Sequence, residues 1–370
     1  MLGKLKVISE MKSYKRIKYL IGFIVLAELA LLGFALTPKP YNIIFLFFNG
    51  LPLGMVWGIV FSYIEGRKAT ELLGVILCSS FIVSSGAVKS VGKYLMNTFV
   101  ISEYWMPVTT GALFLLPLII FAITLENLPK PTEEDKLLKN DRKPLTSKER
   151  IFLFKSMAIP LTLIIFFYMC LTAIRDFRDN FARELWDELG FHDSVSIYSL
   201  SELPITILVL IILGIIGSIK KNYKAFMMYH LILITGATII LLSTLLFQNN
   251  IITPIPWMIT TGFAMYICYV PFNGLFFDRM IATYKIKGNV GFLIYIADAF
   301  GYLASIMVLF YKNFGMNNLS WLQFYTYMIY TIAAVGFIVG AISFNFFKKK
   351  KYKEMESSVM EFQIISTKII

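Results

Sequence analysis

The chain has 370 residues, of which 57% are hydrophobic and only 16% are charged. Soluble globular domains carry about 25% charged residues, so this composition excludes an ordinary soluble protein. The net charge of +12 would suit a nucleic-acid partner, but the Lys and Arg residues lie in short segments between apolar runs. Because this distribution follows the positive-inside rule, we expect a lipid bilayer as partner and no nucleic acid.

Ten stretches are long enough to cross a membrane, since a spanning helix needs about 20 mostly apolar residues. Their hydrophobicity is continuous and lacks the alternation of outer-membrane strands, so we predict an all-α, polytopic membrane helical bundle. The expected spans are Ile17–Leu36, Tyr41–Ile64, Thr70–Gly92, Tyr104–Leu125, Ile151–Arg175, Ser196–Ile219, Ala225–Phe247, Pro254–Phe277, Val290–Phe310 and Leu319–Phe347.

A polar segment, residues 126–150, interrupts this series after four spans and before six. It contains three prolines and charges of both signs, which predicts a flexible linker. We therefore expect four parts. They are an N-terminal half of four spans (1–125), the linker (126–150), a C-terminal half of six spans (151–347) and a basic tail (348–370).

The loops between the spans predict the orientation of the chain. With both termini in the cytoplasm, most of the 35 Lys and Arg residues fall on the inner side, including those of the linker and of the KKKKYK run in the tail. The positive-inside rule therefore predicts cytoplasmic termini and a cytoplasmic linker.

Four charged residues inside the expected spans are candidates for a function: Glu28, Lys89, Glu202 and Asp298. A charge near the middle of a bilayer costs about 2.5–3.5 kcal/mol, and such residues tend to mark pathways or pairs. Glu28 stands among aliphatic residues, so we expect it to pair with a neighbouring helix.

Asp298 shares one helical face with Tyr295 and Tyr302. A polar stripe of this kind faces protein or a water-filled cavity. Two interpretations are open. Asp298 is either a proton or cation site that lines a pathway, or an aspartate that holds two helices together by a bond to a tyrosine or to backbone.

The densest polar group lies at the end of the fifth span. Its members are Arg175, Asp176, Arg178, Asp179 and Asn180. In one interpretation the fifth span continues into the outer loop as a helix whose opposite charges pair at i,i+4 spacing, through Arg183 to Asp187. In the other, Arg175 and Arg178 face the mouth of a cavity and attract an anionic substrate, with the carboxylates orienting the guanidinium groups.

Signals for catalysis are absent from the sequence. It has two histidines and three cysteines, and it contains no metal-binding spacing, phosphate-binding glycine loop or nucleophile motif. We therefore expect no enzyme activity, no metal and no cofactor.

Four stretches carry a family resemblance: LPLGMVWGIVFSYIEGRKATELLG, LTAIRDFRDNFARELW, YVPFNGLFFDRMIA and GFLIYIADAFGYL. They resemble a bacterial family of unknown function that is related to the major facilitator superfamily. Those transporters have six spans in each half. The resemblance therefore implies a major-facilitator-like fold without its first two helices, in the bacterial inner membrane.

The same resemblance implies roles for several charged residues. Lys89 and Glu202 would lie on spans that pack across the two halves, where an ion pair would act as a gate. Alternatively, Lys89 extends to the membrane surface and Glu202 belongs to a helix entry. Acid-plus-arginine turns would close two equivalent spans on the cytoplasmic side, either as functional turns or as interfacial caps. These turns contain Glu65 and Arg67, and Asp278 and Arg279.

Two classes of function follow as expectations. The first is a secondary transporter that moves a small solute, coupled to protons, by alternating access. The second is a non-transporting sensor, scaffold or assembly partner that retains the architecture. In either class, a partner or a second copy of the chain would fill the place of the two missing helices.

Overall fold

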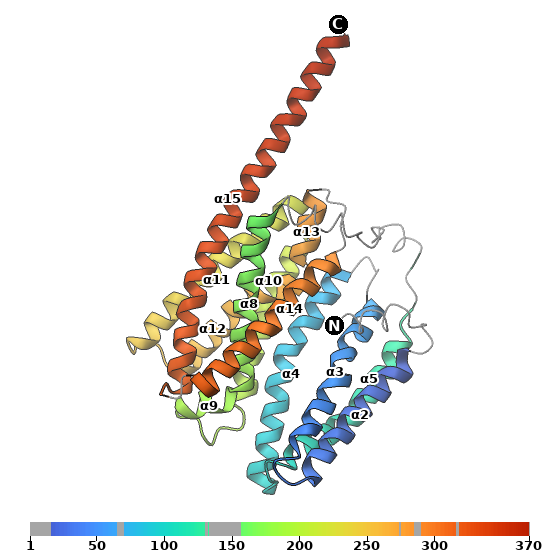
Figure 1. Ribbon diagram of the computed structural model, residues 1–370, viewed down its shortest axis with the longest axis vertical. Helices are drawn as coiled ribbons and strands as arrows, with labels where there is room; N and C mark the ends of the chain where they lie inside the picture. Colours follow the sequence, from blue (N-terminus) through green and yellow to red (C-terminus); the bar gives the residue numbers. More distant parts are fainter. Residues whose placement is uncertain are drawn as a thin grey trace. The chain divides into compact units, whose positions relative to one another are not determined.

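The structure is a computed structural model that describes residues 16–64, 70–129, 132, 157–273, 275–284, 290–315 and 318–369. The side chains of residues 70–71, 290–292, 295 and 353–369 are outside this description. The described residues form helices and no strands (Figure 1). The predicted all-α class is confirmed.

Nine described helices are long and apolar enough to cross a membrane. The ninth expected span also forms a helix, α14 (Val290–Phe310), some of whose side chains are outside the described part of the chain. The protein is thus a multi-pass membrane protein. The nine are α2 (Arg16–Leu36), α3 (Ile43–Ile64), α4 (Thr70–Phe99), α5 (Met106–Glu126), α8 (Ala158–Asn180), α10 (Ile197–Gly217), α11 (Asn222–Gln248), α12 (Pro254–Tyr269) with its continuation η2 (Val270–Asn273), and α15 (Trp321–Ile369).

The chain divides into two compact units. Unit 1 comprises Met1–Gly74, Val83–Asn140 and Ser194–Leu200, and unit 2 comprises Val75–Ile82, Asp141–Asp193 and Ser201–Ile370.

In unit 1, helix α2 packs against α3 and α5. Leu20, Ile59 and Ala122, one from each helix, form the buried centre of this packing. At one end of α2, the Tyr63 hydroxyl donates a hydrogen bond to Glu126, and the guanidinium of Arg16 lies 5.8 Å from the centre of the Tyr63 ring. Polar contacts therefore tie the three helices together at this end, next to the apolar side chains of the buried centre.

In unit 2, helix α8 packs against α12, α14 and α15, and α11 packs against α12 and α15. Small residues permit this close packing, as is usual between membrane helices. A methyl group on Gly336 of α15 would lie 2.8 Å from the ring of Phe167 on α8. Because glycine has no side chain, the two backbones approach and enclose the Phe167 ring, which is buried.

The eighth span is broken, although the sequence analysis treated Pro254–Phe277 as one stretch. Helix α12 ends at Tyr269, η2 covers Val270–Asn273, and α13 runs from Leu275 to Thr283. Pro271 explains the break, because it has no backbone N–H to donate and its ring clashes with the preceding helical turn. This span is therefore discontinuous at a buried position.

The fifth span also ends earlier than one interpretation expected. Helix α8 stops at Asn180, and a separate short helix, α9, covers Ala182–Glu188. Between them, the ring of Phe181 stacks on Trp321 at a centroid distance of 4.1 Å. This contact anchors the chain at the break, so the helix does not continue in a straight line.

Helix α15 differs from the expected span with a separate tail. It continues without a break through the KKKKYK run to Ile369, a length of 49 residues. Its C-terminal part extends beyond α8 and α11, the helices against which it packs (Figure 1).

Candidate functional site

Helix α8 places three polar side chains along one face. Tyr168, Thr172 and Arg175 follow at i, i+4 and i+7, the spacing that aligns side chains on a helix. A methyl group on Gly301 of α14 would lie 2.8 Å from the Thr172 hydroxyl oxygen. Gly301 therefore brings α14 against this polar face, and Asp298 lies one turn earlier on α14.

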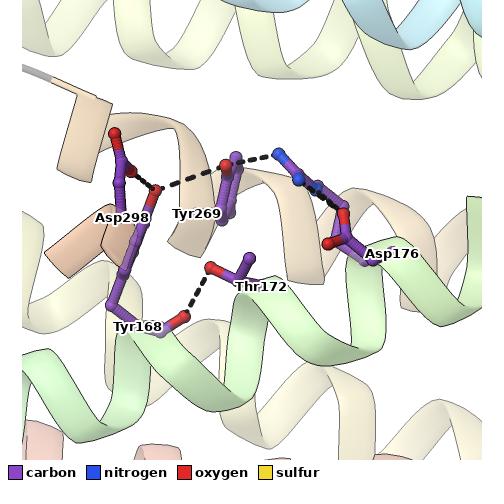
Figure 2. A network of polar contacts seen from close by, with 6 residues as sticks. Tyr168, Thr172, Asp176, Tyr269 and Asp298 are labelled. Carbon is purple, nitrogen blue, oxygen red and sulfur yellow. Dashed lines mark hydrogen bonds and ion pairs between the residues drawn. The ribbon is translucent and has the colours of Figure 1, made fainter. Parts of the chain in front are cut away.

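Asp298 is bound directly by this face. The Tyr168 hydroxyl donates a hydrogen bond of 2.6 Å to Asp298 Oδ1 (Figure 2). The bond joins α8 to α14, which is the geometry of one of the two interpretations of Asp298. Tyr168 itself is buried.

Tyr269 connects the pair to Arg175. Its ring stacks on that of Tyr168, with centroids 5.3 Å apart and planes 10° apart, and the two hydroxyl oxygens are 3.3 Å apart. Arg175 Nη1 donates to the Tyr269 hydroxyl. Tyr269 is the last residue of α12, so this contact lies at the break in the eighth span.

Asp176 completes the group on the other side of the guanidinium. Arg175 Nε donates to Asp176 Oδ1 at 3.0 Å, and Arg175 Nη2 pairs with the same oxygen (Figure 2). We call the five residues Asp298, Tyr168, Tyr269, Arg175 and Asp176 the tyrosine network. It has a carboxylate at each end and one cation.

The hydrogen bonds of the tyrosine network point in one direction. A tyrosine hydroxyl has a single proton, and that of Tyr168 is donated to Asp298. The Tyr269 hydroxyl therefore donates to the Tyr168 oxygen and accepts from Arg175. Hydrogen bonds aligned in this way polarise one another, so a change in the charge bound at Arg175 alters the strength of the hydrogen bond that Asp298 accepts.

The two arginines of the predicted polar group differ in their surroundings. The Arg175 side chain is 24% exposed, whereas that of Arg178 is only 4% exposed. Arg178 Nη1 pairs with Glu202 Oε1 of α10 at 2.6 Å, and Nη2 donates to the Met258 carbonyl of α12 at 3.4 Å. The expectation that both arginines face a cavity mouth is thus corrected for Arg178, because protein encloses it.

The expected ladder of charges is only partly present. Arg183 and Asp187 of α9 pair at 3.8 Å, but the carboxylate partner of Arg175 is its neighbour Asp176. The break after Asn180 separates the two parts of the ladder. Asp179 is half-buried and Asn180 is exposed at the end of α8.

The predicted ion pair between Lys89 and Glu202 relates residues of the two units, and it stays a prediction. Within unit 1, Lys89 Nζ donates to the Ser85 hydroxyl at 2.8 Å. Within unit 2, Glu202 is bound by Arg178. A charge swap between Lys89 and Glu202 would place a lysine against Arg178, so it would not test the pair cleanly.

Arg279 binds the end of α10. Its guanidinium donates to Asn222 Oδ1 at 2.6 Å and to the carbonyl of Gly217 at 3.1 Å. Gly217 is the last residue of α10, and a cation there interacts favourably with the helix dipole. Its neighbour Asp278 lies in the first turn of α13, and the equivalent turn with Glu65 and Arg67 is outside the described residues.

The stripe on α14 is only partly visible. Tyr302 is exposed, at 54%. Tyr295 belongs to α14, but its side chain is outside the described part of the chain.

Tyr168 and Tyr269 were not among the residues predicted from the sequence. The spacing of Tyr168, Thr172 and Arg175 was a usable signal, because it places them on one helix face. Tyr269 had a weaker signal, its position just before Val270 and Pro271. No group of three His, Cys, Asp or Glu residues that could hold a metal occurs among the residues that the structure describes.

A family model matches residues 1–350 and is described as a family of unknown function, DUF5690. The chain belongs to this family. No curated protein matches the chain. The stretches that contain Tyr168, Arg175, Tyr269 and Asp298 all lie inside the part matched by DUF5690.

Proposed function

We propose that this protein is a secondary transporter of the major facilitator type, which carries a small anionic solute together with protons. Arg175 would be the cationic contact for the solute, and Asp298 would be an associated proton site. The observation that carries the proposal is the tyrosine network at the break in the eighth span, where α12 ends.

A break of this kind suits a binding site. In secondary transporters, substrate and ion sites are typically formed at discontinuous helices near the middle of the membrane. Here Tyr269 ends α12 immediately before the break and contacts Arg175. Charges inside membrane helices carry a high free-energy cost of desolvation. A charged network at this position therefore favours a functional role over a packing role.

Arg175 has the properties of an anion contact. Its side chain is partly exposed, and Asp176 and Tyr269 accept hydrogen bonds from its guanidinium and so hold the orientation of its plane. A planar guanidinium binds carboxylates and phosphates through two parallel hydrogen bonds. An anionic solute would replace Asp176 or the Tyr269 hydroxyl as its acceptor.

The directed hydrogen bonds suggest how solute and proton are coupled. With Arg175 free, donation passes from Arg175 through Tyr269 and Tyr168 to Asp298, which favours the charged carboxylate. An anion on Arg175 neutralises the start of this chain. Proton binding at Asp298 and anion binding at Arg175 would therefore support one another.

Reconstituted vesicles test the proposal. The full chain is placed in lipid vesicles, and uptake of labelled carboxylates, amino acids and organic phosphates is measured with and without an inward proton gradient. We expect uptake of at least one class to rise with the gradient. Asp298→Asn should abolish the effect of the gradient, because the amide cannot exchange a proton at neutral pH.

A second variant tests the anion contact. Arg175→Gln removes charge-assisted hydrogen bonds worth about 1.5–3 kcal/mol, so affinity should fall about 10-fold to 100-fold. Arg183→Gln is the matched control, since Arg183 is exposed on α9 and belongs to no part of the tyrosine network. Folded wild-type protein that binds an anion without moving it would contradict transport and favour a sensor.

A further inference from the structure

Glu28 lies near the middle of a membrane helix in unit 1. It is about 18 Å along α2 from Arg16, at a rise of 1.5 Å per residue. Helix α2 packs against α3 and α5, and the Glu28 side chain is partly buried. Its position along α2 places it near mid-membrane, far from bulk water on either side of the bilayer.

A glycine on α5 makes room for the carboxyl group. A methyl group on Gly111 would lie 2.0 Å from Glu28 Oε2 and 2.8 Å from its carboxyl carbon. Any side chain at Gly111 would thus collide with Glu28. Glu28 Oε1 is enclosed by protein and has no hydrogen-bond partner among the described residues.

Charged groups are distant from Glu28 on the helices that pack against it. Helix α3 carries no charged residue, and the only one on α5 is Glu126. Glu126 and Tyr63 bind one another at the end of α3 and α5 where α2 begins, about 22 Å from Gly111 along α5. Arg16, Lys18 and Tyr19 of α2 also lie towards that end, more than two turns from Glu28.

Three further cations lie in the described part of unit 1 and are engaged elsewhere. Lys39 Nζ lies 4.9 Å from the centre of the Tyr104 ring. On α4, Lys89 donates to Ser85, and Lys93 Nζ lies 5.8 Å from the centre of the Tyr198 ring. The expectation that Glu28 pairs with a neighbouring helix is therefore corrected in the described part of unit 1. Its neighbour is the backbone of Gly111.

An ionised carboxylate without a partner is expensive in this environment, whereas the neutral acid is far less so. A metal ion is a poor alternative, because hard cations need about six oxygen ligands and Glu28 offers one carboxyl group. The ligand that matches this site is a proton.

We propose that Glu28 is a second proton-binding site, which holds its proton while packed on Gly111 and releases it when α2 and α5 separate there. This role rests on the proposed function, for which it supplies a carrier of the coupled proton in unit 1. The proton passes between water and a carboxyl oxygen, so no other reactant is needed.

Infrared spectroscopy tests the site without any transport measurement. The full chain in lipid vesicles is titrated with pH, and the C=O stretch of protonated carboxyl groups is recorded. We expect a band at neutral pH that disappears in Glu28→Gln and remains in Asp298→Asn. An identical band in the wild type and in Glu28→Gln would overturn the proposal.

A glycine pair tests the role of the α2–α5 contact. Gly111→Ala should displace the carboxyl group from its contact with α5, so the pH at which the Glu28 band titrates should change. Gly22→Ala on α2 is the matched control, because a methyl group there meets no atom within 4 Å. Equal titration in both variants would contradict the proposed contact.

Proton counting links the site to transport. In the vesicle assay, Glu28→Gln should lower the number of protons moved per solute molecule. An unchanged ratio would overturn the role of Glu28 in coupling. Absence of any flux in the wild type would instead contradict the proposed function, while the infrared band would still decide whether Glu28 binds a proton.

Discussion

Arg178 and Glu202 form a buried ion pair whose place depends on a single glycine. A methyl group on Gly262 of α12 would lie 2.9 Å from Arg178 Nη2 and 2.6 Å from Ile205 Cδ1. The absence of a side chain at Gly262 is thus what allows the guanidinium to lie between α8, α10 and α12. Removing one partner of a buried ion pair strongly lowers the stability of the fold, because the other charge stays buried without compensation.

Gly262→Ala is expected to destabilise the protein by about 1–3 kcal/mol, the usual cost of overpacking a filled interior. Melting temperature in detergent measures the effect. Gly214→Ala on α10 is the control, because a methyl group there meets no atom within 4 Å. Equal melting temperatures for the two variants would show that Arg178 has room to move.

Tyr168→Phe is expected to destabilise the protein by about 1–3 kcal/mol, because it leaves Asp298 Oδ1 without its donor. Tyr327→Phe is the comparison, since Tyr327 is exposed on α15. Denaturant titration of both variants gives the difference. A Tyr168→Phe protein as stable as the wild type would mean that Asp298 finds another donor.

At the scale of elements, Glu188 of α9 caps the start of α15. Its carboxylate accepts hydrogen bonds from the N–H groups of Trp321 and Leu322, both at 2.9 Å, and from the Ser320 hydroxyl at 2.6 Å. A carboxylate at a helix N-terminus accepts hydrogen bonds from the free N–H groups and interacts favourably with the positive end of the helix dipole. Lys312 adds to this join, since it donates to the Leu319 carbonyl and lies over the Trp321 ring.

The Glu188 cap predicts a pH dependence. Partial burial raises the pKa of Glu188, but hydrogen bonds from Ser320, Leu322 and Trp321 outweigh it, so the pKa lies below the ordinary value of 4.5. A carboxyl group with a lowered pKa stabilises the fold fully above its unfolded value. That contribution is lost as the pH falls from about 4.5 through the lowered pKa.

Glu188→Gln is therefore expected to melt at a lower temperature than the wild type at neutral pH, with a difference that shrinks below about pH 4.5. Glu184→Gln, on the same helix, is the control. The melting temperatures of both variants and of the wild type are measured between about pH 3 and pH 7, because carboxyl groups titrate in the lower part of this range. A difference that is constant over this range would mean that the charge of Glu188 is unimportant.

At the scale of the whole molecule, the orientation predicted from the loops is open to a direct test. Both termini and the linker are expected in the cytoplasm, because they contain most of the Lys and Arg residues. A green fluorescent protein fused after Ile370 should fluoresce, since it folds in the cytoplasm and not after export. Alkaline phosphatase fused at Glu103, between α4 and α5, should be active. The reverse pattern would contradict the predicted orientation.

Much of the fold was predictable, because a spanning helix can be recognised in the sequence by its length and hydrophobicity. Nine of the ten expected spans appear among the long apolar helices, and the remaining one, Val290–Phe310, forms α14. The break at Pro271 was readable in principle, since proline interrupts a helix wherever it occurs. The break at Phe181 was not, because it depends on a stacking partner 140 residues away, Trp321.

The candidate site was predictable only in its charged members. Asp298 and Arg175 stood out because charges are rare in membrane helices. Tyr168 and Tyr269 did not, since tyrosine is common in this chain and suits membrane surfaces as well as hydrogen bonds. The sequence also treated Arg175 and Arg178 alike, although one is partly exposed and the other is buried.

The sequence by itself determined that this is a multi-pass helical membrane protein, because backbone groups in lipid must pair within a helix and each crossing needs about 20 apolar residues. Only the tertiary structure decided which costly charges pair and which have no charged partner among the residues that the structure describes. Arg178 forms an ion pair with Glu202, Asp298 accepts a hydrogen bond from Tyr168, and Glu28 packs against Gly111. The physical reason is that the two partners in each contact come from different helices. Which helices pack closely depends on small residues, and their effect becomes apparent only when two backbones lie side by side.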